Sequence, residues 1–347
     1  MTRRHAALVF LILFLGGCAT QRAFDTDKPI SAIAFGSCID TNVHPMLDTF
    51  LKQRWDLAVM LGDNIYADTT NATVMRAKYE ERKQSHFWQS LRSRAPLLAT
   101  WDDHDFGWND SGANYAMKVE SQRLFLEFMD EPADSERRRR EGVYDAHVFS
   151  PPGKRVQIIL LDTRYFRSTL STGIHTAVPS GGRYVPSAET DKTMLGEAQW
   201  LWLEKQLKVP ADVRVIASSI QFISEFSGAE AWANMPHEKK RMLDLVERTE
   251  RAGGGGILFI SGDRHWAELS RLDRPGLPPL YDLTSSALTQ KHPRGTPTPN
   301  RYRDGPTYHD ANMGLIFIDW DHRKGSGPQI RLRLLDAAGR VRIEKTL

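Results

Sequence analysis

The sequence predicts an α/β protein, built either as one mixed sheet or as two packed sheets with helices outside. Three observations support this. Short apolar runs of strand length recur along the chain, stretches with helical spacing lie between the early runs, and the later runs follow one another without such stretches. The chain has 347 residues and a net charge of +3, with acidic and basic residues mixed along it. Its length allows a large core, and its charge does not imply a nucleic-acid partner.

The first eighteen residues resemble an export signal and are not expected to belong to the fold. Arg3 and Arg4 form a short basic region, residues 6–15 form an apolar run, and a Leu-Gly-Gly-Cys sequence ends at Cys18. This pattern predicts a bacterial lipoprotein signal peptide over residues 1–18, with lipid attached to Cys18 after cleavage. An ordinary secretory signal with a chance cysteine is the alternative, and the paired arginines leave twin-arginine export open beside the general secretory route.

Residues 19–29 are polar and without periodicity, which predicts a tether, and residues 30–347 are expected to form a single domain. We therefore expect a monomer in the bacterial cell envelope, anchored to the membrane through Cys18 and facing the periplasm or the exterior. In that compartment Cys38 is left without a second cysteine for a disulfide. It is either a small buried residue or a metal ligand.

The apolar runs that predict strands differ in what surrounds them. The early runs cover residues 33–35, 57–61, 97–99, 156–161, 213–217 and 257–260, and the later runs cover 280–283, 315–320, 330–335 and 341–343. Helical spacing places three sets of residues on helix faces: Tyr115, Val119, Leu126 and Met129; Trp200, Leu203 and Leu207; and Met242, Leu245 and Val246. Alternation of strands and helices followed by strands alone predicts sheets of mixed direction.

Two long loops are predicted outside these elements. Residues 168–192 are rich in Ser, Thr and Gly, and residues 290–310 are rich in Pro and Arg. Loops of this length are expected to be functional lids or mobile segments. A run of arginines at 137–140 has acidic neighbours and is expected to be a solvated helix end or turn, with an anion site as the alternative.

Residue types that bind metals come directly after several of the predicted strands. The segments concerned are Gly36-Ser37-Cys38, Gly62-Asp63-Asn64-Ile65-Tyr66-Ala67-Asp68, Trp101-Asp102-Asp103-His104-Asp105-Phe106-Gly107-Trp108-Asn109-Asp110, Leu161-Asp162-Thr163-Arg164 and Ser261-Gly262-Asp263-Arg264-His265. Any single aspartate there could close a turn or cap a helix. Several carboxylates at one sheet edge repel one another unless cations hold them, so the set favours a site with more than one metal ion.

A site of this kind is suited to phosphoester hydrolysis, which needs a nucleophilic oxygen at neutral pH and stabilisation of charge on the transferring group. Two metal ions about 3.5–4 Å apart can activate the attacking water and stabilise charge on the phosphoryl oxygens. The site also needs a shared carboxylate, outer ligands from other strands, and a His or Arg to protonate the leaving oxygen or steady the phosphoryl group. The strand ends contain all of these residue types.

Taken together and in order, these segments, followed by Thr284-Ser285-Ser286, resemble the alkaline phosphatase D (PhoD-like) family of metallophosphoesterases. The resemblance covers about residues 32–288 and is weakest after that. It implies a calcineurin-like metallophosphoesterase fold, which is a four-layer α/β/β/α sandwich with mixed sheets. Many members of the family carry an extra β domain before the first motif, where this chain has only the tether.

The resemblance implies a site that holds Fe3+ and Ca2+, although another pair of divalent metals remains possible. In that pattern Asp63 bridges the two ions, and Cys38 and Tyr66 bind the ferric ion as thiolate and phenolate. A phenol ionises at neutral pH only beside a strong Lewis acid, which favours iron(III). On the calcium side the implied ligands are Asn109 and Asp263, whose oxygen atoms calcium prefers.

Other residues of these motifs are implied to act in catalysis. Asp103 and His104 lie near the calcium ion, His265 lies in or beside the metal shell, and Arg164 contacts the phosphate. A salt bridge to Asp162 or a neighbour is the alternative for Arg164, and a capping or core position is the alternative for His104. This chain reads Trp-Asp-Asp-His-Asp-Phe-Gly-Trp-Asn-Asp in that segment, a departure that leaves the amide-type ligand open between Asn109 and Asp110.

These inferences predict a metal-dependent hydrolase of extracytoplasmic phosphoesters, either a phosphodiesterase or a phosphomonoesterase. Two alternatives remain. A phospholipase D-like lipid phosphodiesterase is favoured by the membrane anchor and by Trp108 and Trp232, which are expected to be exposed. A lipoprotein that binds metal or phosphate without turnover is disfavoured, because the residues for acid–base chemistry and phosphate contact are all present.

Overall fold

The computed structural model describes residues 28–149, 151–173, 183–225, 228–291, 298–322 and 327–347. The predicted signal peptide with Cys18 and nearly all of the tether lie outside these described residues. Within them, none of the helices combines the length and the apolar character that crossing a membrane requires.

The first sheet has six strands in the order β12-β11-β10-β1-β2-β3. They are β1 (Ala32–Gly36), β2 (Leu57–Leu61), β3 (Leu97–Thr100), β10 (Asn312–Asp319), β11 (Gln329–Asp336) and β12 (Val341–Thr346). Strands β1, β2 and β3 are parallel, and β10 pairs with β1 in the antiparallel direction. The carboxyl ends of the three parallel strands therefore lie at one edge of the sheet.

The second sheet also has six strands, in the order β4-β5-β6-β7-β9-β8. They are β4 (Asp145–Phe149), β5 (Val156–Leu160), β6 (Val213–Ser218), β7 (Gly256–Ser261), β8 (Ala267–Arg274) and β9 (Leu277–Ser285). Strands β5, β6, β7 and β9 run parallel, while β4 and β8 are antiparallel to their neighbours. Both sheets are mixed, as the sequence predicts.

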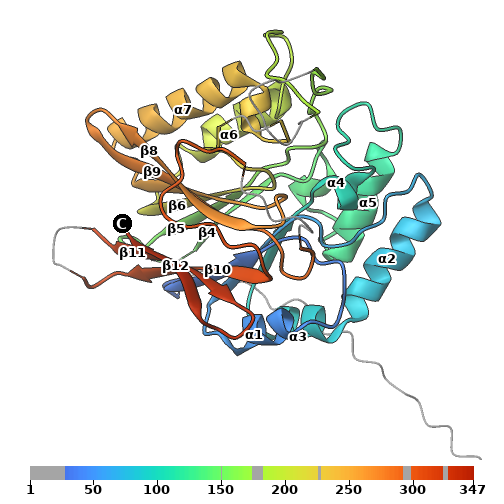
Figure 1. The fold of residues 1–347 in the computed structure, drawn as a ribbon, viewed down its shortest axis with the longest axis horizontal. Coiled ribbons are helices and arrows are strands. Elements are labelled where there is room, and N and C mark those ends of the chain that lie inside the picture. The colour runs from blue at the N-terminus through green and yellow to red at the C-terminus, as the bar shows by residue number, and fades with distance from the viewer. Residues whose placement is uncertain (1–27, 150, 174–182, 226–227, 292–297, 323–326) are drawn as a thin grey trace, which may run out of the picture.

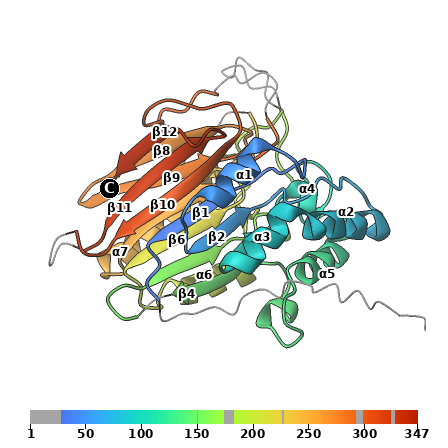
Figure 2. The ribbon, with the colours of Figure 1, turned by 90° about the horizontal axis from the view of Figure 1, so that it is seen from below.

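Helices cover the outer faces of the two sheets, so the fold has four layers (Figures 1 and 2). The helices are α1 (Pro45–Lys52), α2 (Ala72–Gln84), α3 (His86–Arg94), α4 (Asp103–Phe106), α5 (Lys118–Phe128), α6 (Gly196–Gln206) and α7 (Pro236–Arg251). Helices α1 and α3 lie against the first sheet, and α6 and α7 lie against the second. Two short 3-10 helices cover Glu136–Arg138 and Trp232–Asn234.

Alternating strand residues explain the layers. In β1, Ile33 and Phe35 belong to the core between the two sheets, whereas Ala34 packs with the helices outside the first sheet. In β5, Ile158 faces the core between the sheets, and Ile159 packs with α6 and α7. Because successive side chains of a strand point to opposite faces, strands that are buried on both faces are apolar throughout.

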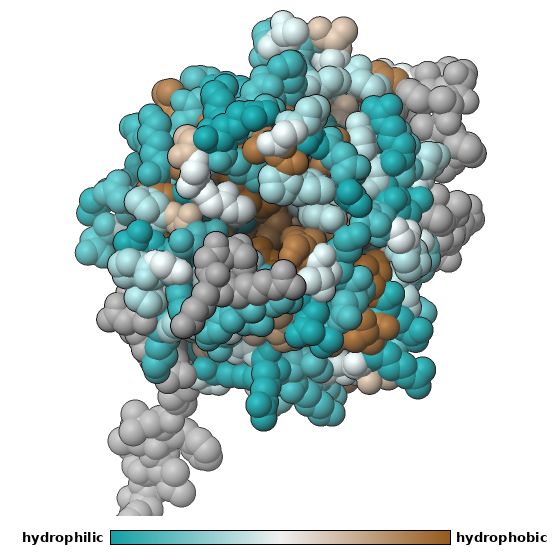
Figure 3. Space-filling model, turned by 90° about the vertical axis from the view of Figure 1, so that its left-hand side faces the viewer, coloured by the Kyte–Doolittle hydropathy of each residue, from teal (hydrophilic) through white to brown (hydrophobic). Residues whose placement is uncertain are grey.

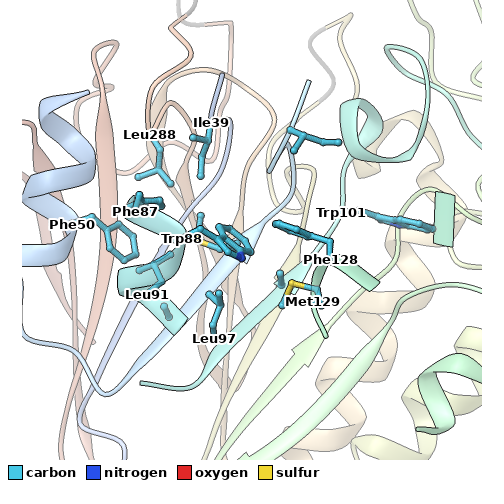
Figure 4. Packing of buried hydrophobic residues seen from close by; sticks show 14 of the residues in the cluster. Ile39, Phe50, Phe87, Trp88, Leu91, Leu97, Trp101, Phe128, Met129 and Leu288 are labelled. Atoms are coloured by element: carbon cyan, nitrogen blue, oxygen red, sulfur yellow. The ribbon is translucent and has the colours of Figure 1, made fainter. Parts of the chain in front are cut away.

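Aromatic rings fix the outer helices on the first sheet. Trp88 of α3 stacks on Phe128 of α5 with ring centroids 4.5 Å apart (Figure 4). Phe50 of α1 meets Phe87 of α3 edge-on at 5.5 Å. Such pairs stabilise a core by about 0.5–1.5 kcal/mol beyond the burial of their area. They hold α1, α3 and α5 against the sheet whose strand ends carry the first motifs.

The predicted strands are confirmed within a few residues, but some elements were not predicted. Strands β4 and β8 and helices α1, α2 and α3 are short or weakly patterned. The face predicted for the helix near residue 120 is wrong for Val119, which is 66% exposed, although Leu126 and Met129 are buried. The solvated turn predicted at 137–140 is wrong for Arg137, which is buried and donates to the carbonyls of Ala99 and Val143.

In the parts that the structure describes, both predicted loops are held by β-bridges. Thr172 and Tyr184 form a β-bridge across the first loop, and residues of the second loop bridge to β8. At the opposite end of the molecule from α4, where β1 begins, the surface is mostly hydrophilic, with hydrophobic residues gathered in a hollow near its centre (Figure 3). The motifs lie at the other end, where the parallel strands finish.

Candidate metal centre

The carboxyl ends of four strands bring the predicted ligands together across the two sheets. Cys38 follows β1, Asp63 follows β2, Asp103 begins α4 directly after β3, and Asp263 follows β7. Cys38, Asp63 and Asp263 have φ angles of 62°, 50° and 68°, and His265 has 58°. A left-handed backbone outside glycine costs about 1–3 kcal/mol per residue and persists only where the surroundings impose it. Its repetition at these strand ends is typical of a functional site.

Glycine and a buried carboxylate hold two of these loops close together. Gly62 has a φ of +106°, and a Cβ there would lie 2.6 Å from the backbone nitrogen of Asp102. Asp105 accepts hydrogen bonds from the backbone N–H groups of Asn64 and Ile65, at 3.0 and 3.2 Å, and of Asp102, at 3.0 Å. Asp105 therefore fixes the loop after β2 on the loop after β3 and does not face the predicted metal ions as a free ligand.

Asp63 lies at the centre of the site. The thiol of Cys38 donates to Asp63 Oδ2 at 3.4 Å, and the hydroxyl of Tyr66 donates to the same oxygen at 3.2 Å. Tyr66 Oη is also 3.3 Å from Nε2 of His265. These four side chains come from the first sheet and the second, so the site forms only when the two sheets pack together.

Among the described residues, ligand atoms lie within 4.8 Å of one another in four sets: Cys38, Asp63 and His265; Asp63, Asp103 and His104; Asp102, Asp103 and Asp263; and Asp103, Asp110 and Glu230. Asp63 belongs to the first two sets, and Asp103 belongs to the last three. Overlapping sets of this kind are suited to more than one cation, with a carboxylate shared between neighbouring ions.

Asn109 and Asp110, the two candidates for the amide-type ligand, lie in different surroundings. Asn109 is exposed, whereas Asp110 is partly buried and its carboxylate lies with those of Asp103 and Glu230. The backbone N–H of Asp110 donates to Asp103 Oδ2 at 2.7 Å, and Tyr184 Oη donates to Asp110 Oδ2 at 2.5 Å. The fold thus brings Asp110 to the acidic groups and leaves Asn109 at the surface.

Arg164 lies at the base of the site, fully buried. Its Nε donates to Asp102 at 2.5 Å, its Nη2 contacts the same carboxylate, and its Nη1 lies 2.6 Å from Glu230. Its backbone N–H, and not its guanidinium, bonds to the carboxylate of Asp162. All three nitrogens of the guanidinium therefore contact carboxylates of the protein.

His104 lies at the edge of the site. Its Nδ1 is 2.7 Å from Asp68 Oδ1, and its ring lies 4.3 Å from that of Tyr66. Burial opposes protonation of His104, but the hydrogen bond with Asp68 and the charge of Asp103 outweigh burial and raise its pKa. The capping position considered for His104 does not describe its side chain, which bonds to a loop carboxylate.

The sequence matches the model of the PhoD-like phosphatase family over residues 33–323. This chain belongs to the PhoD-like phosphatase family. No curated protein shows significant sequence similarity to it.

Two solved structures are similar in fold to this PhoD-like chain. One, described as the structure of PhoD, is 16% identical with a TM-score of 0.66, and the match covers 92% of this chain and 73% of that chain. The other is the purple acid phosphatase PPD1 from yellow lupin (Lupinus luteus) seeds, which is 10% identical with a TM-score of 0.60. That match covers 93% of this chain and 54% of the lupin protein. The metallophosphoesterase sandwich predicted from the sequence is confirmed.

The electrostatics of this PhoD-like site agree with a cation among the carboxylates. Burial and the neighbouring charge of Asp103 raise the pKa of Asp63, and burial and the charge of Asp102 raise the pKa of Asp263. Oδ1 of Asp63 is buried without a hydrogen-bond partner among the described residues. A buried carboxylate that is unpaired and surrounded by like charge is unfavourable unless it binds a proton or a metal ion.

The pKa values of the other predicted ligands also show how their surroundings affect the charged form. Burial, followed by the charge of Asp63, raises the pKa values of both the Cys38 thiol and the Tyr66 phenol. Both groups are therefore neutral donors in the protein alone, and both must lose a proton to bind a metal. Asp103 differs, because Arg164 and His104 outweigh burial and lower its pKa to about 2. The donor set fits a metal centre, and with the family it supports a metal-dependent phosphatase.

Two residues of the site were not predicted. Glu230 and Arg167 lie outside the motifs, and Glu230 does not come directly after a strand. Arg167 Nη2 is 3.0 Å from Glu230 and donates to the carbonyls of Asp110 and Ser111. The sequence carries no local signal for Glu230, since it reaches the site only through the packing of a loop. The prediction that Trp232 is exposed is wrong, because its ring is buried and its Nε1 donates to Ser218.

Proposed function

We propose that this protein is an exported hydrolase of phosphoesters that uses a site containing Fe3+ and Ca2+. The observation that carries the proposal is the position of Asp63. It contacts Cys38 and Tyr66 on one side and shares a ligand set with Asp103 and His104 on the other. A carboxylate between a thiol and phenol pair and a group of carboxylates is suited to bridge a ferric ion and a calcium ion.

The residues divide between the two ions by donor chemistry. Cys38, Tyr66 and His265 offer sulfur, phenol oxygen and ring nitrogen to the ferric ion. Asp263 offers a carboxylate to the calcium ion, together with Asp110 or Asn109, and we favour Asp110 because its carboxylate lies with that of Asp103. When bound, the ions would activate the attacking water and neutralise charge on the phosphoryl oxygens.

The chain itself supplies positioning and a proton. His104 is held by Asp68 and carries a raised pKa, so it is suited to donate a proton to the leaving oxygen. Arg164 fixes Asp102 and lies 3.8 Å from Asp103, so it orients carboxylates at the metal centre.

Metal analysis and absorption spectroscopy on the same purified sample would test this proposal, together with assays on a chromogenic monoester and a chromogenic diester. We expect iron and calcium, a visible charge-transfer band, and hydrolysis of at least one substrate. Cys38→Ser should weaken or shift the band if the thiolate binds iron. A colourless zinc or manganese enzyme would contradict the metal assignment, and the absence of metal-dependent hydrolysis of both esters would contradict the function.

We further propose that the protein is attached to a membrane of the bacterial cell envelope through Cys18 and faces the periplasm or the exterior. The support is the basic, apolar and small-residue order of residues 1–18. Fractionation of cells that express Cys18→Ser would test the anchor. The variant should leave the membrane fraction, and its retention there would contradict lipid attachment.

Hydrolysis of phospholipids is a second candidate, and one of the two tryptophans that favoured it is exposed. Trp108 is 48% exposed and lies two residues from Asp110, whereas Trp232 is buried. An exposed indole beside the site is suited to the membrane interface. Comparison of rates on lipid vesicles and on a soluble diester would separate the two candidates. Trp108→Ala should slow only the vesicle reaction if lipid is the substrate.

A further inference from the structure

Two arginines of the motifs differ in what they contact, and the difference bears on how a substrate would be held. The Arg164 guanidinium is fully buried, and its three nitrogens contact Asp102 and Glu230. A phosphoryl group that replaced either carboxylate would separate that buried carboxylate from the Arg164 guanidinium, which is unfavourable even though Ser219 still donates to Asp102 and Arg167 still contacts Glu230. Arg164 is therefore a positioning residue for carboxylates.

Arg264 lies in the loop after β7, between Asp263 and His265. Its side chain is nine-tenths buried, with 10% of it exposed. Its Nε is buried and has no hydrogen-bond partner among the described residues. Its one ion-pair contact within the described chain is from Nη1 to Asp263 Oδ2 at 3.9 Å, which is too long for a hydrogen bond. The guanidinium thus keeps donors that no described group uses.

The surroundings hold this guanidinium in place. Its Cζ lies 4.4 Å from the ring centroid of Trp266, and Trp266 is buried. Stacking on a ring fixes the plane of the donor fork without using its N–H groups. The backbone N–H of Arg264 donates to the carbonyl of Gly262 at 2.9 Å, and the backbone N–H of His265 donates to Ser286 at 2.7 Å. The loop is therefore fixed on both sides of Arg264.

Arg264 places its positive charge beside the acidic ligands, since its Nη1 lies 3.9 Å from Asp263 Oδ2. A buried cation beside acidic ligands, with donors left over, is suited to a tetrahedral oxyanion that approaches the metal centre.

We propose that Arg264 binds the phosphoryl group of the substrate, while Arg164 only orients the acidic ligands. This rests on the proposed function, since it assigns a substrate contact at the same metal centre. The ligand class is a phosphate oxyanion with at least two free oxygens for the arginine fork. Inorganic phosphate, as product and simplest member of the class, is the probe.

The test measures binding of inorganic phosphate to the full-length, metal-loaded protein by calorimetry, with bound metal quantified in every sample. We expect Arg264→Gln to weaken phosphate binding by about 10- to 100-fold, the range for a lost hydrogen bond to a charged group. Arg264→Lys should weaken it less, because it keeps the charge but loses the fork. Metal content should match that of the unmodified protein in both variants.

Arg271→Gln is the matched control. Arg271 lies on β8, pairs with Asp273 at the surface, and has no place in the site, so its replacement should leave phosphate affinity unchanged. In steady-state assays, Arg264→Gln should raise KM for a charged ester. Arg164→Gln, by contrast, should reduce the metal content.

Unchanged phosphate affinity in Arg264→Gln at full metal occupancy would overturn the proposal, and so would a metal-loaded protein that binds no phosphate at all. If Arg264→Gln does not fold, unchanged affinity in Arg264→Lys would overturn it. A protein that binds phosphate through Arg264 but hydrolyses no ester would overturn the proposed function and leave this assignment standing. The two failures are therefore distinguishable.

Discussion

The two sheets contribute different chemistry to the same site. The strands of the first sheet deliver Cys38, Asp63, Asp102 and Asp103, which are thiol or acidic groups. The segments after strands of the second sheet deliver Asp263 and Glu230 but also three buried or nearly buried arginines, at positions 164, 167 and 264. Arg164 pairs with an acid from each side of the molecule. Arginines fixed on the second sheet therefore stabilise the acidic groups of the first sheet, in addition to any bound metal.

Replacement of Asp63 by Asn should give the largest effect. Asp63 belongs both to the ligand set of Cys38 and His265 and to that of Asp103 and His104, and an amide cannot bridge two cations as a carboxylate does. We expect kcat/KM to fall by about three orders of magnitude or more, as when a central catalytic group is removed. Asp56→Asn, which alters a carboxylate bonded only to the start of β1, is the control. A variant of Asp63 that keeps both metal ions and most activity would contradict the bridging role.

Loss of Arg164, which contacts an acid from each side of the site, should give the next largest effect. We expect it to lower the free energy of unfolding. Arg164→Met removes both guanidinium contacts of Asp102 and one of the two of Glu230, which keeps Arg167, and breaking a buried pair costs about 3–5 kcal/mol. Denaturant unfolding would measure the loss. Addition of Asp102→Asn to the variant should restore part of the stability, because it removes the charge that has lost both of its guanidinium contacts. Equal stability of Arg164→Met and the unmodified protein would contradict the role of Arg164.

Removal of the metal ions should lower the free energy of unfolding by somewhat less than the loss of Arg164. An ion that binds only the folded state stabilises it by about 2.7 kcal/mol at a concentration of 100 times its Kd. We expect a chelator to lower the thermal midpoint of the unmodified protein. It should not lower that of Asp63→Asn, which has already lost its metal. A midpoint that the chelator leaves unchanged in both proteins would show that the arginines alone offset the repulsion among the acids.

These effects show how far the sequence could predict the site. The strands, and the order of residues such as Cys38 and Asp63 after them, were predictable because a buried parallel strand is a continuous apolar run and its end faces the ligand edge. Glu230 was not predictable, since it lies well beyond the end of β6 in a loop without periodic pattern. The choice of Asp110 over Asn109 depends on the turn after α4, and the burial of Trp232 depends on its packing against α6; neither leaves a periodic signal in the sequence.

A partly buried cation that has no carboxylate within ion-pair distance among the described residues gives the smallest expected effect. Lys239 of α7 donates to the carbonyls of Ile223 and Ser224 at 2.9 and 2.8 Å. Burial lowers its pKa from 10.5 to about 8, whereas the carboxylates around Arg164 raise the pKa of that residue against burial. A cation of this half of the molecule therefore holds its proton more tightly where carboxylates contact it directly.

The sign of the pH dependence follows from the lowered pKa of Lys239. Between about pH 8 and 10.5 the unfolded chain holds this proton and the folded chain releases it. The free energy of unfolding therefore rises with pH in this window, by up to about 1.4 kcal/mol per pH unit from this residue. In Lys239→Met the rise should be smaller by that amount, as measured by denaturant unfolding at several pH values. Lys240→Met, which alters an exposed neighbour paired with Asp244, should keep the rise of the unmodified protein. Parallel stability curves for Lys239→Met and the unmodified protein would show that Lys239 is charged in the fold, and that carbonyl oxygens can hold a buried cation in the second half without a carboxylate.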